Sequence, residues 1–354
     1  MRWDSLRLDS SDARDPAGGT TLPLIERNAV ARTFDTPEFR GMTFYEIHAK
    51  SIVSEVPKSS RMMFRYTINP YRGCQHSCRY CFARQSHTYL DMDAGRDFDT
   101  RVVVKVNAPE LLRAKLASPS WGGEHIAMGT NVDPYQRAEG RYKLTRGIIE
   151  ALRDAANPFS ILTKGTLITR DLDLLRSAAE VTDVGLNVSA AFVDKSLWRA
   201  IEPGTPAPER RIEACAALND AGLRCGVLMG PVVPYLSDSP AQLAATVRQA
   251  AEAGAVHVTP IVLHLRPGAR EWFLGWLREA HPELVPRYAE LYGRGAYARK
   301  DYQARIAGQV RDLAERFGVG RGAGRPDGGT PRGRGTAAGP PRPPAAPHEQ
   351  LSLL

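Results

Sequence analysis

The sequence predicts an α/β fold of the barrel type, built from serial βα units around a parallel sheet. Between roughly residues 62 and 317, a short β-rich run, a polar loop and an amphipathic stretch with helical spacing of alanine and leucine follow one another repeatedly. The length of 354 residues suits one such domain with extensions. Because this alternation is typical of parallel strands with right-handed crossovers, ligands are expected at the carboxyl ends of the strands.

The individual elements follow from local patterns. An alternating segment at 43–56 predicts a strand ahead of the repeating region. Within that region we expect strands at 64–69, 125–129, 159–163, 184–189, 224–229 and 257–263. Helices are expected at 142–157, 170–181, 208–221, 240–253 and 269–280.

Composition narrows the class of protein. Hydrophobic residues make up 43% and charged residues 24% of the chain, which is typical of a globular protein rather than a membrane or fibrous one. The N-terminus mixes charges of both signs and lacks the apolar stretch of a signal peptide, so we expect a cytoplasmic protein with no membrane association. The net charge of +8 is compatible with a polyanionic partner such as DNA.

Three of the five cysteines fall close together in INPYRGCQHSCRYCFAR, directly after the first strand of the repeating region. Cys74, Cys78 and Cys81 are too clustered for a disulfide framework and are spaced for metal ligation. Three thiolates suit a four-iron cluster and leave one iron open to an external ligand. The alternative is a zinc site, which needs a fourth protein ligand. His76 could supply it in principle, but its place inside the tight loop favours a residue facing substrate or solvent.

This motif resembles the signature of radical S-adenosylmethionine (SAM) enzymes, including the aromatic Tyr80 before the third cysteine. It is similar to the spore photoproduct lyase-like, or DNA repair photolyase-like, branch of actinobacterial type. Four later segments look like this branch in the same order: IAMGTNVDPYQRAEG, ILTKGTLITRDLDLL, LNVSAAFVDKSLWRAIEPGTPAPERR and VLMGPVVPYLSD. The resemblance implies a partial (β/α)6 TIM-type barrel, a [4Fe-4S] cluster, SAM chelated to the open iron, and an electron donor such as flavodoxin or ferredoxin.

Further cofactor-binding candidates follow the later strands. Asn131 and Asp133 lie where the family places its motif for the SAM amino group, although Asp-Pro is also a common turn starter. Lys164 could contact a carboxylate or phosphate, or could be an ordinary exposed lysine. Ser189 matches the position from which family members reach the SAM ribose or carboxylate.

The remaining candidates are less direct. Arg210 could pair with the SAM carboxylate through two hydrogen bonds, or could lie on a solvated helix face. Met229 looks like part of the family's adenine-side wall. Photoproduct lyases use a thiol to return hydrogen, but the next cysteine after the motif is Cys215, so Tyr135 is the candidate hydrogen donor. Cys215 and Cys225 are expected to be small buried hydrophobes.

We divide the chain into an N-terminal extension (1–55), a radical SAM core (56–317), a linker (318–347) and a terminal peptide (348–354). The linker is rich in Gly, Pro and Arg and has almost no large apolar residues, so it is expected to be disordered. The terminal EQLSLL is similar to the peptide by which bacterial repair proteins dock on the sliding clamp, although it could be a random apolar tail. The matching positions are Gln350, Leu351, Leu353 and Leu354.

Two functions follow from these patterns. The first is a radical SAM enzyme, for example a lyase, that acts on DNA in repair and is assisted by clamp docking and basic charge. The second is a radical SAM enzyme that modifies a small molecule, a protein or RNA. A non-enzymatic iron–sulfur module is a more distant alternative.

Overall fold

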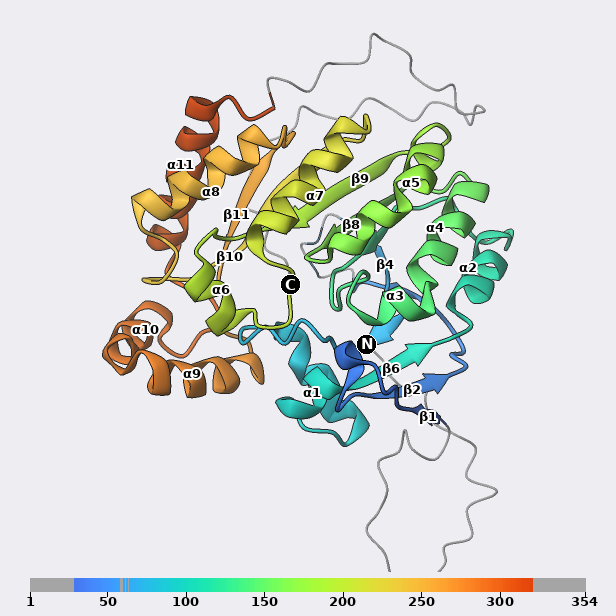
Figure 1. Ribbon diagram of the computed structural model, residues 1–354, viewed down its shortest axis with the longest axis horizontal. Helices are drawn as coiled ribbons and strands as arrows, with labels where there is room; N and C mark the ends of the chain where they lie inside the picture. The colour runs from blue at the N-terminus through green and yellow to red at the C-terminus, as the bar shows by residue number, and fades with distance from the viewer. Residues whose placement is uncertain (1–28, 58–59, 61, 63, 321–354) are drawn as a thin grey trace, which may run out of the picture.

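The computed structural model describes residues 29–57, 60, 62 and 64–320. Its main sheet has the strand order β11-β10-β9-β8-β7-β4-β3, and the first six of these strands run parallel (Figure 1). These parallel strands are β4 (Tyr66–Ile68), β7 (Ile126–Met128), β8 (Phe159–Thr163), β9 (Val184–Ser189), β10 (Cys225–Val232) and β11 (Val258–Val262). The order follows the chain from β4 to β11, and neither edge strand pairs with the other. The predicted parallel α/β fold, a partial barrel, is therefore confirmed.

Helices cover the outer side of this sheet (Figure 1). They are α2 (Ala108–Leu116), α4 (Leu144–Asp154), α5 (Leu172–Ala179), α7 (Pro208–Asp220), α8 (Pro240–Glu252) and α11 (Lys300–Phe317). Helices α7 and α8 begin with proline, whose fixed φ suits the first helical turn. In α4, Ile148, Ile149 and Leu152 form the buried face that packs on the sheet.

The alternating segment at 43–56 forms two strands in two sheets, rather than the single strand predicted. Strand β2 (Thr43–Ile47) pairs with β1 (Val30–Arg32) and β6 (Arg101–Lys105), whereas β3 (Val53–Glu55) pairs antiparallel with β4. Between them, Asn107 accepts a hydrogen bond from the Ala49 amide at 2.9 Å and donates one to its carbonyl at 3.0 Å. This side chain satisfies backbone groups that a strand partner would otherwise bind, so the chain can change sheets there.

The smaller sheet has the order β1-β2-β6-β5, with β5 (Tyr71–Arg72) at its edge. Near it lie η2 (Pro37–Phe39), η3 (Phe82–Leu90) and α1 (Arg96–Thr100). Phe44 and Val102 of this sheet and Phe98 of α1 share a core cluster with Cys74. The N-terminal extension therefore contributes strands to a sheet that supports the cysteine motif.

The remaining helices cover the carboxyl ends of the strands and complete the chain (Figure 1). They are α3 (Ala138–Tyr142), η4 (Thr166–Asp171), α6 (Lys195–Ile201), α9 (Ala269–Ala280), η5 (Pro282–Leu284) and α10 (Val285–Tyr292). Helix α11 is followed by Gly318, which caps it with φ 72°. Most of the predicted linker and all of the terminal peptide lie outside the described residues. Among the described helices, none is both long enough and apolar enough to span a bilayer.

Candidate active site

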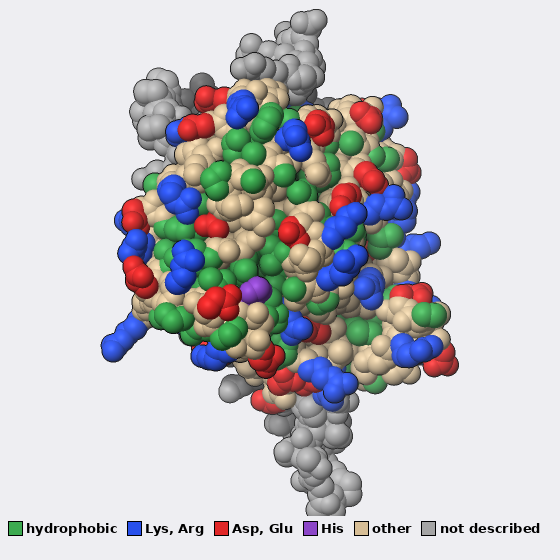
Figure 2. All heavy atoms as spheres, turned by 60° about the vertical axis from the view of Figure 1, so that its left-hand side comes forward, with side chains coloured by type: hydrophobic (Ala, Val, Ile, Leu, Met, Phe, Trp, Pro, Cys, Tyr) green, Lys and Arg blue, Asp and Glu red, His purple; other side chains and the backbone are tan. Residues whose placement is uncertain are grey.

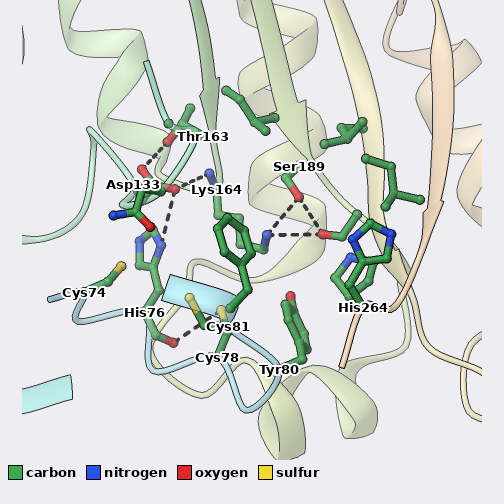
Figure 3. A pocket seen from close by; sticks show the side chains of 18 of the residues that line it. Cys74, His76, Cys78, Tyr80, Cys81, Asp133, Thr163, Lys164, Ser189 and His264 are labelled. Carbon is green, nitrogen blue, oxygen red and sulfur yellow. Dashed lines mark hydrogen bonds and ion pairs between the residues drawn. The ribbon is translucent and has the colours of Figure 1, made fainter. Parts of the chain in front are cut away.

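A cavity of about 160 Å³ opens at the carboxyl ends of the main-sheet strands, where the fold predicts a ligand (Figure 3). We call it the cofactor pocket. One wall comes from the cysteine loop (residues 73–81), and the others come from the ends of β7, β8, β9, β10 and β11. Eight of the residues predicted from the sequence line it: Cys74, Cys78, Tyr80, Cys81, Asn131, Asp133, Lys164 and Ser189.

The cysteine loop is held by backbone contacts from distant segments. At one end, the Cys74 amide donates to the Phe98 carbonyl at 3.0 Å. In the middle, the His76 carbonyl accepts from the Gly204 amide at 3.1 Å. A Cβ at Gly204 would lie 2.1 Å from the carbonyl oxygen of Gln75, so only glycine allows this approach.

The outer side of the loop is anchored by Arg84, whose side chain is fully buried. Its guanidinium donates two hydrogen bonds to the Cys78 carbonyl, at 3.0 and 3.2 Å, and two to the Asp99 carboxylate, at 2.8 and 3.0 Å. It also lies over the ring of Trp272 in α9, 4.8 Å from the ring centroid. Arg84 therefore fixes the carbonyl between the second and third cysteines.

The three motif thiols fit an iron–sulfur cluster. None of them is in a disulfide, and burial raises the pKa of Cys74, Cys78 and Cys81. Each thiolate is therefore costly unless a cation binds it, and iron supplies that charge.

Asp133 is held as an anion at the wall of the cofactor pocket that faces the cysteine loop. His76 Nδ1 lies 3.4 Å from its carboxylate, and the Thr163 hydroxyl and the Lys164 amide each donate to it at 2.6 Å. Burial alone would raise the pKa of this carboxyl, but the neighbouring His76 and these hydrogen bonds outweigh it and lower the pKa to about 2. His76, which sequence reasoning placed toward substrate or solvent, is buried against this carboxylate and lines the cofactor pocket.

Opposite Asp133, the Lys164 side chain reaches across the pocket (Figure 3). Its Nζ donates to Ser189 Oγ at 2.9 Å and to the Gly230 carbonyl at 3.3 Å, and Ser189 Oγ donates to the same carbonyl at 3.0 Å. Two of the three ammonium protons therefore point at acceptors of the protein. The ammonium nitrogen lies 5.8 Å from the ring centroid of Tyr80. The pocket thus presents a carboxylate and an ammonium on separate walls, which suits a zwitterionic amino acid group.

A buried network behind the pocket was not predicted. Tyr80 donates through its hydroxyl to Glu202, and Glu202 forms an ion pair with Arg211. Arg211 also donates to the Ser189 carbonyl at 3.0 Å. Burial acts to raise the pKa of Glu202, but the cations of Arg211 and Lys164 outweigh it and lower that pKa. The network therefore joins the cysteine loop to the end of β9.

The structure places Arg210 away from the pocket. Its side chain is 72% exposed and pairs with Glu213 at 2.9 Å, whereas the neighbouring Arg211 is 1% exposed. Helical spacing would have indicated the difference, because Arg211 lies on the same face as Cys215 and Leu218, which are both buried.

Two other candidates also lie outside the cofactor pocket. Met229 is buried in the core, while Leu228, Gly230 and Pro231 form the pocket wall beside it. The Tyr135 hydroxyl donates to Asp171 at 3.1 Å, and the residue lines a second cavity. The cofactor role of Met229 and the hydrogen-donor role of Tyr135 remain predictions.

Comparison with known proteins defines the class. The family model of the Radical SAM superfamily matches residues 68–248, which include the cysteine loop and the strands from β7 to β10. The chain therefore belongs to the radical SAM superfamily and is an enzyme. Membership implies a [4Fe-4S] cluster and SAM as cofactors.

Individual relatives extend this match. An uncharacterized protein of Mycobacterium tuberculosis is 48% identical over 317 residues, covering 90% of this chain and 93% of its own. An uncharacterized protein of Methanocaldococcus jannaschii is 34% identical over 174 residues, covering 49% of this chain and 62% of its own. A mutant spore photoproduct lyase with bound AdoMet and dinucleoside spore photoproduct has a TM-score of 0.56 at 16% identity, covering 74% of this chain and 77% of that one. This last likeness is one of fold.

Proposed function

We propose that this enzyme binds a [4Fe-4S] cluster through Cys74, Cys78 and Cys81 and cleaves SAM reductively in the cofactor pocket. The observation that supports it is that the three thiols and the Lys164 ammonium line one cavity. When bound, the reduced cluster supplies the electron that breaks the sulfonium bond of SAM, which yields methionine and a 5′-deoxyadenosyl radical. A flavodoxin or ferredoxin is the proposed source of that electron.

The residues of the pocket divide the binding of SAM between them. Asp133, held as an anion, accepts hydrogen bonds from the SAM amino group, with Asn131 beside it in the same wall. Lys164 and Ser189 bind the carboxylate or the ribose. The adenosyl group lies against an apolar wall that excludes water from the radical, formed by Leu228, Pro231, Ile261, Val262 and Leu263.

For the substrate we propose DNA, in a repair reaction. The net charge of +8 supports it, as does the fold shared with a spore photoproduct lyase whose structure contains a dinucleoside spore photoproduct. The alternative substrate classes are a small molecule, a protein or RNA. With no cysteine between the motif and Cys215, hydrogen return to the substrate is assigned to a tyrosine, for which Tyr135 is the candidate.

The test is anaerobic reconstitution followed by reduction with dithionite in the presence of SAM. Slow formation of 5′-deoxyadenosine is expected without substrate, and faster formation is expected when irradiated DNA is added. Lys164→Met should raise the Kd for SAM by about tenfold or more, because a charged hydrogen bond is lost. A reduced, cluster-loaded protein that neither binds nor cleaves SAM would contradict the proposal.

The terminal peptide carries a separate proposal, docking on the bacterial sliding clamp. Leu351 and Leu354 would fill apolar pockets of the clamp, and Gln350 would fix the register of the peptide. The double variant Leu351→Ala, Leu354→Ala should lose clamp binding and keep its iron and its SAM cleavage. If a labelled peptide ending in HEQLSLL shows no saturable binding to the cognate clamp, this docking is excluded.

A further inference from the structure

A second cavity, of about 720 Å³, lies beside the cofactor pocket, and His76 lines both. Its walls come from four separate parts of the chain: the N-terminal segment at 36–39, the start of α3, the loop at 165–167 after β8, and the crossover at 204–206. None of the residues to which we assign the binding of SAM lines this space. The cavity is therefore a candidate for the part of the substrate that lies outside the reacting centre.

Overall charge alone does not locate a binding face. On the face shown in Figure 2, lysine and arginine side chains are interspersed with aspartate and glutamate over most of the surface. A site for an anion therefore needs cations that no neighbouring carboxylate neutralises.

The second cavity contains two such cations, Arg137 and Arg141, which we call the cavity arginines. They are four residues apart and so lie on the same side of α3, and both are exposed. Arg137 donates to the Gly204 carbonyl at 3.3 Å, and Arg141 lies over the Phe34 ring at 3.7 Å from its centroid. In the part of the chain that the structure describes, neither guanidinium forms an ion pair with a carboxylate.

Two nearby arginines, in contrast, form ion pairs with carboxylates. Arg146 pairs with Asp171 at 3.0 Å and with Asp173 at 3.1 Å, and Arg170 also pairs with Asp171, at 2.9 Å. Among the described residues, Glu38 is the one acidic residue that lines the second cavity. The cavity arginines therefore keep N–H donors for a ligand, and the planar guanidinium matches phosphate in particular.

The size of the cavity favours more than a single anion. Its volume lies within the range of about 300 to 1,000 Å³ that is common for small-molecule sites. A concave site with two arginines suits a flexible strand that carries phosphates better than it suits the broad face of a folded protein.

We propose that the second cavity is a phosphate-binding subsite for single-stranded DNA. The cavity arginines hold a phosphodiester of the strand, and the neighbouring nucleotide then lies next to the cofactor pocket. This inference rests on the proposed function, because it takes DNA as the substrate.

The test uses the full chain with its cluster reconstituted and a short, fluorescein-labelled single-stranded oligodeoxynucleotide. Binding is followed by anisotropy at several salt concentrations. The double variant Arg137→Gln, Arg141→Gln is expected to bind on the order of tenfold more weakly. Its salt slope should fall by about 0.7, because one phosphodiester is no longer neutralised.

The control is Arg248→Gln, which removes one positive charge from the exposed surface of α8. It should bind DNA within about twofold of the natural chain, since it lies on the outer wall. The variant Arg137→Lys separates charge from geometry, because it should keep the salt slope and lose part of the affinity.

The outcomes separate the two proposals. If the natural chain binds DNA and the double variant matches it in affinity and slope, the subsite is wrong while the proposed function stands. If the natural chain cleaves SAM but binds no DNA, the substrate proposal and the subsite fail together. If the double variant keeps its DNA affinity and loses reduction by flavodoxin, the cavity receives the acidic electron donor, and the inference is overturned.

Discussion

Two arginine–carboxylate pairs flank the cysteine loop, and the pKa of the carboxyl group is shifted in opposite directions in the two pairs. Outside the loop, Arg84 pairs with Asp99, where burial outweighs the guanidinium and raises the pKa of Asp99 to about 6. Behind the cofactor pocket, Arg211 pairs with Glu202, whose pKa is lowered.

The difference comes from the surroundings of each carboxylate. Glu202 lies near a second cation, Lys164, and accepts a hydrogen bond from Tyr80. Together with Arg211, these groups stabilise its negative charge by more than burial destabilises it. Asp99 shares the guanidinium of Arg84 with backbone carbonyls, including that of Cys78 in the loop. The inner pair thus keeps Glu202 ionised behind the pocket, while the outer pair mainly binds backbone carbonyls of the loop and its neighbours.

The largest expected effect lies in the loop between the two pairs. Cys74→Ala, Cys78→Ala or Cys81→Ala should each remove the iron, about four atoms per chain, because each thiolate binds one corner of the cluster. Iron analysis after anaerobic reconstitution measures this. Cys215→Ala is the matched control and should keep its iron, and retention in any motif variant would refute the ligand assignment.

Breaking the pocket-side pair should cost the most stability. Glu202→Leu leaves the Arg211 cation buried and unpaired, which typically costs about 3–5 kcal/mol. Denaturant unfolding of the apoprotein measures the loss. The double variant Glu202→Leu, Arg211→Met should recover part of it. Arg210→Gln, on the exposed face of the same helix, should stay within about 0.5 kcal/mol, and a similarly small loss for Glu202→Leu would contradict the description of a buried pair.

A smaller cost is expected on the outer side. Arg84→Lys keeps the charge but cannot reach Asp99 and the loop carbonyls together, so we expect a loss of about 2 kcal/mol. Because Arg84 positions the loop, the electron paramagnetic resonance signal of the reduced cluster should also shift. Arg96→Lys, on the exposed start of α1, is the control. An unchanged signal in Arg84→Lys would show that Arg84 contributes to packing but does not position the cluster ligands.

The pH dependence of the outer pair is the smallest effect. Asp99 has a pKa of about 6 when folded and about 3.9 when unfolded. The folded state therefore binds more protons between these values, and the free energy of unfolding falls as pH rises through that window, by at most about 1.4 kcal/mol per pH unit. Urea titrations across the window measure the slope. Asp99→Asn should remove the contribution of Asp99 to this pH dependence. If the slope of the free energy of unfolding against pH is unchanged in this variant, another group is responsible for the titration.

The sequence predicted the elements whose signals are local. Strands β8 and β9 have the bounds expected from their apolar runs, and the motif cysteines are recognised by spacing alone. Of the smaller sheet, only β2 falls within a predicted strand, because its pairing with β6 joins segments far apart in the chain and no repeat of strand and helix indicates it. The role of Arg211 was missed for a related reason, since its partner Glu202 lies outside its helix and only the helical register separates it from Arg210.

The contacts that hold the cysteine loop bear on the order of translation and cluster insertion. Its supports include Gly204 in the crossover and Trp272 in α9, which the ribosome adds long after the cysteines themselves. When only the motif has left the ribosome, the three thiols lack the later segments that contact the cysteine loop in the folded protein. We therefore expect the cluster to be inserted after α9 has been synthesised, when the cysteine loop already has its supporting contacts.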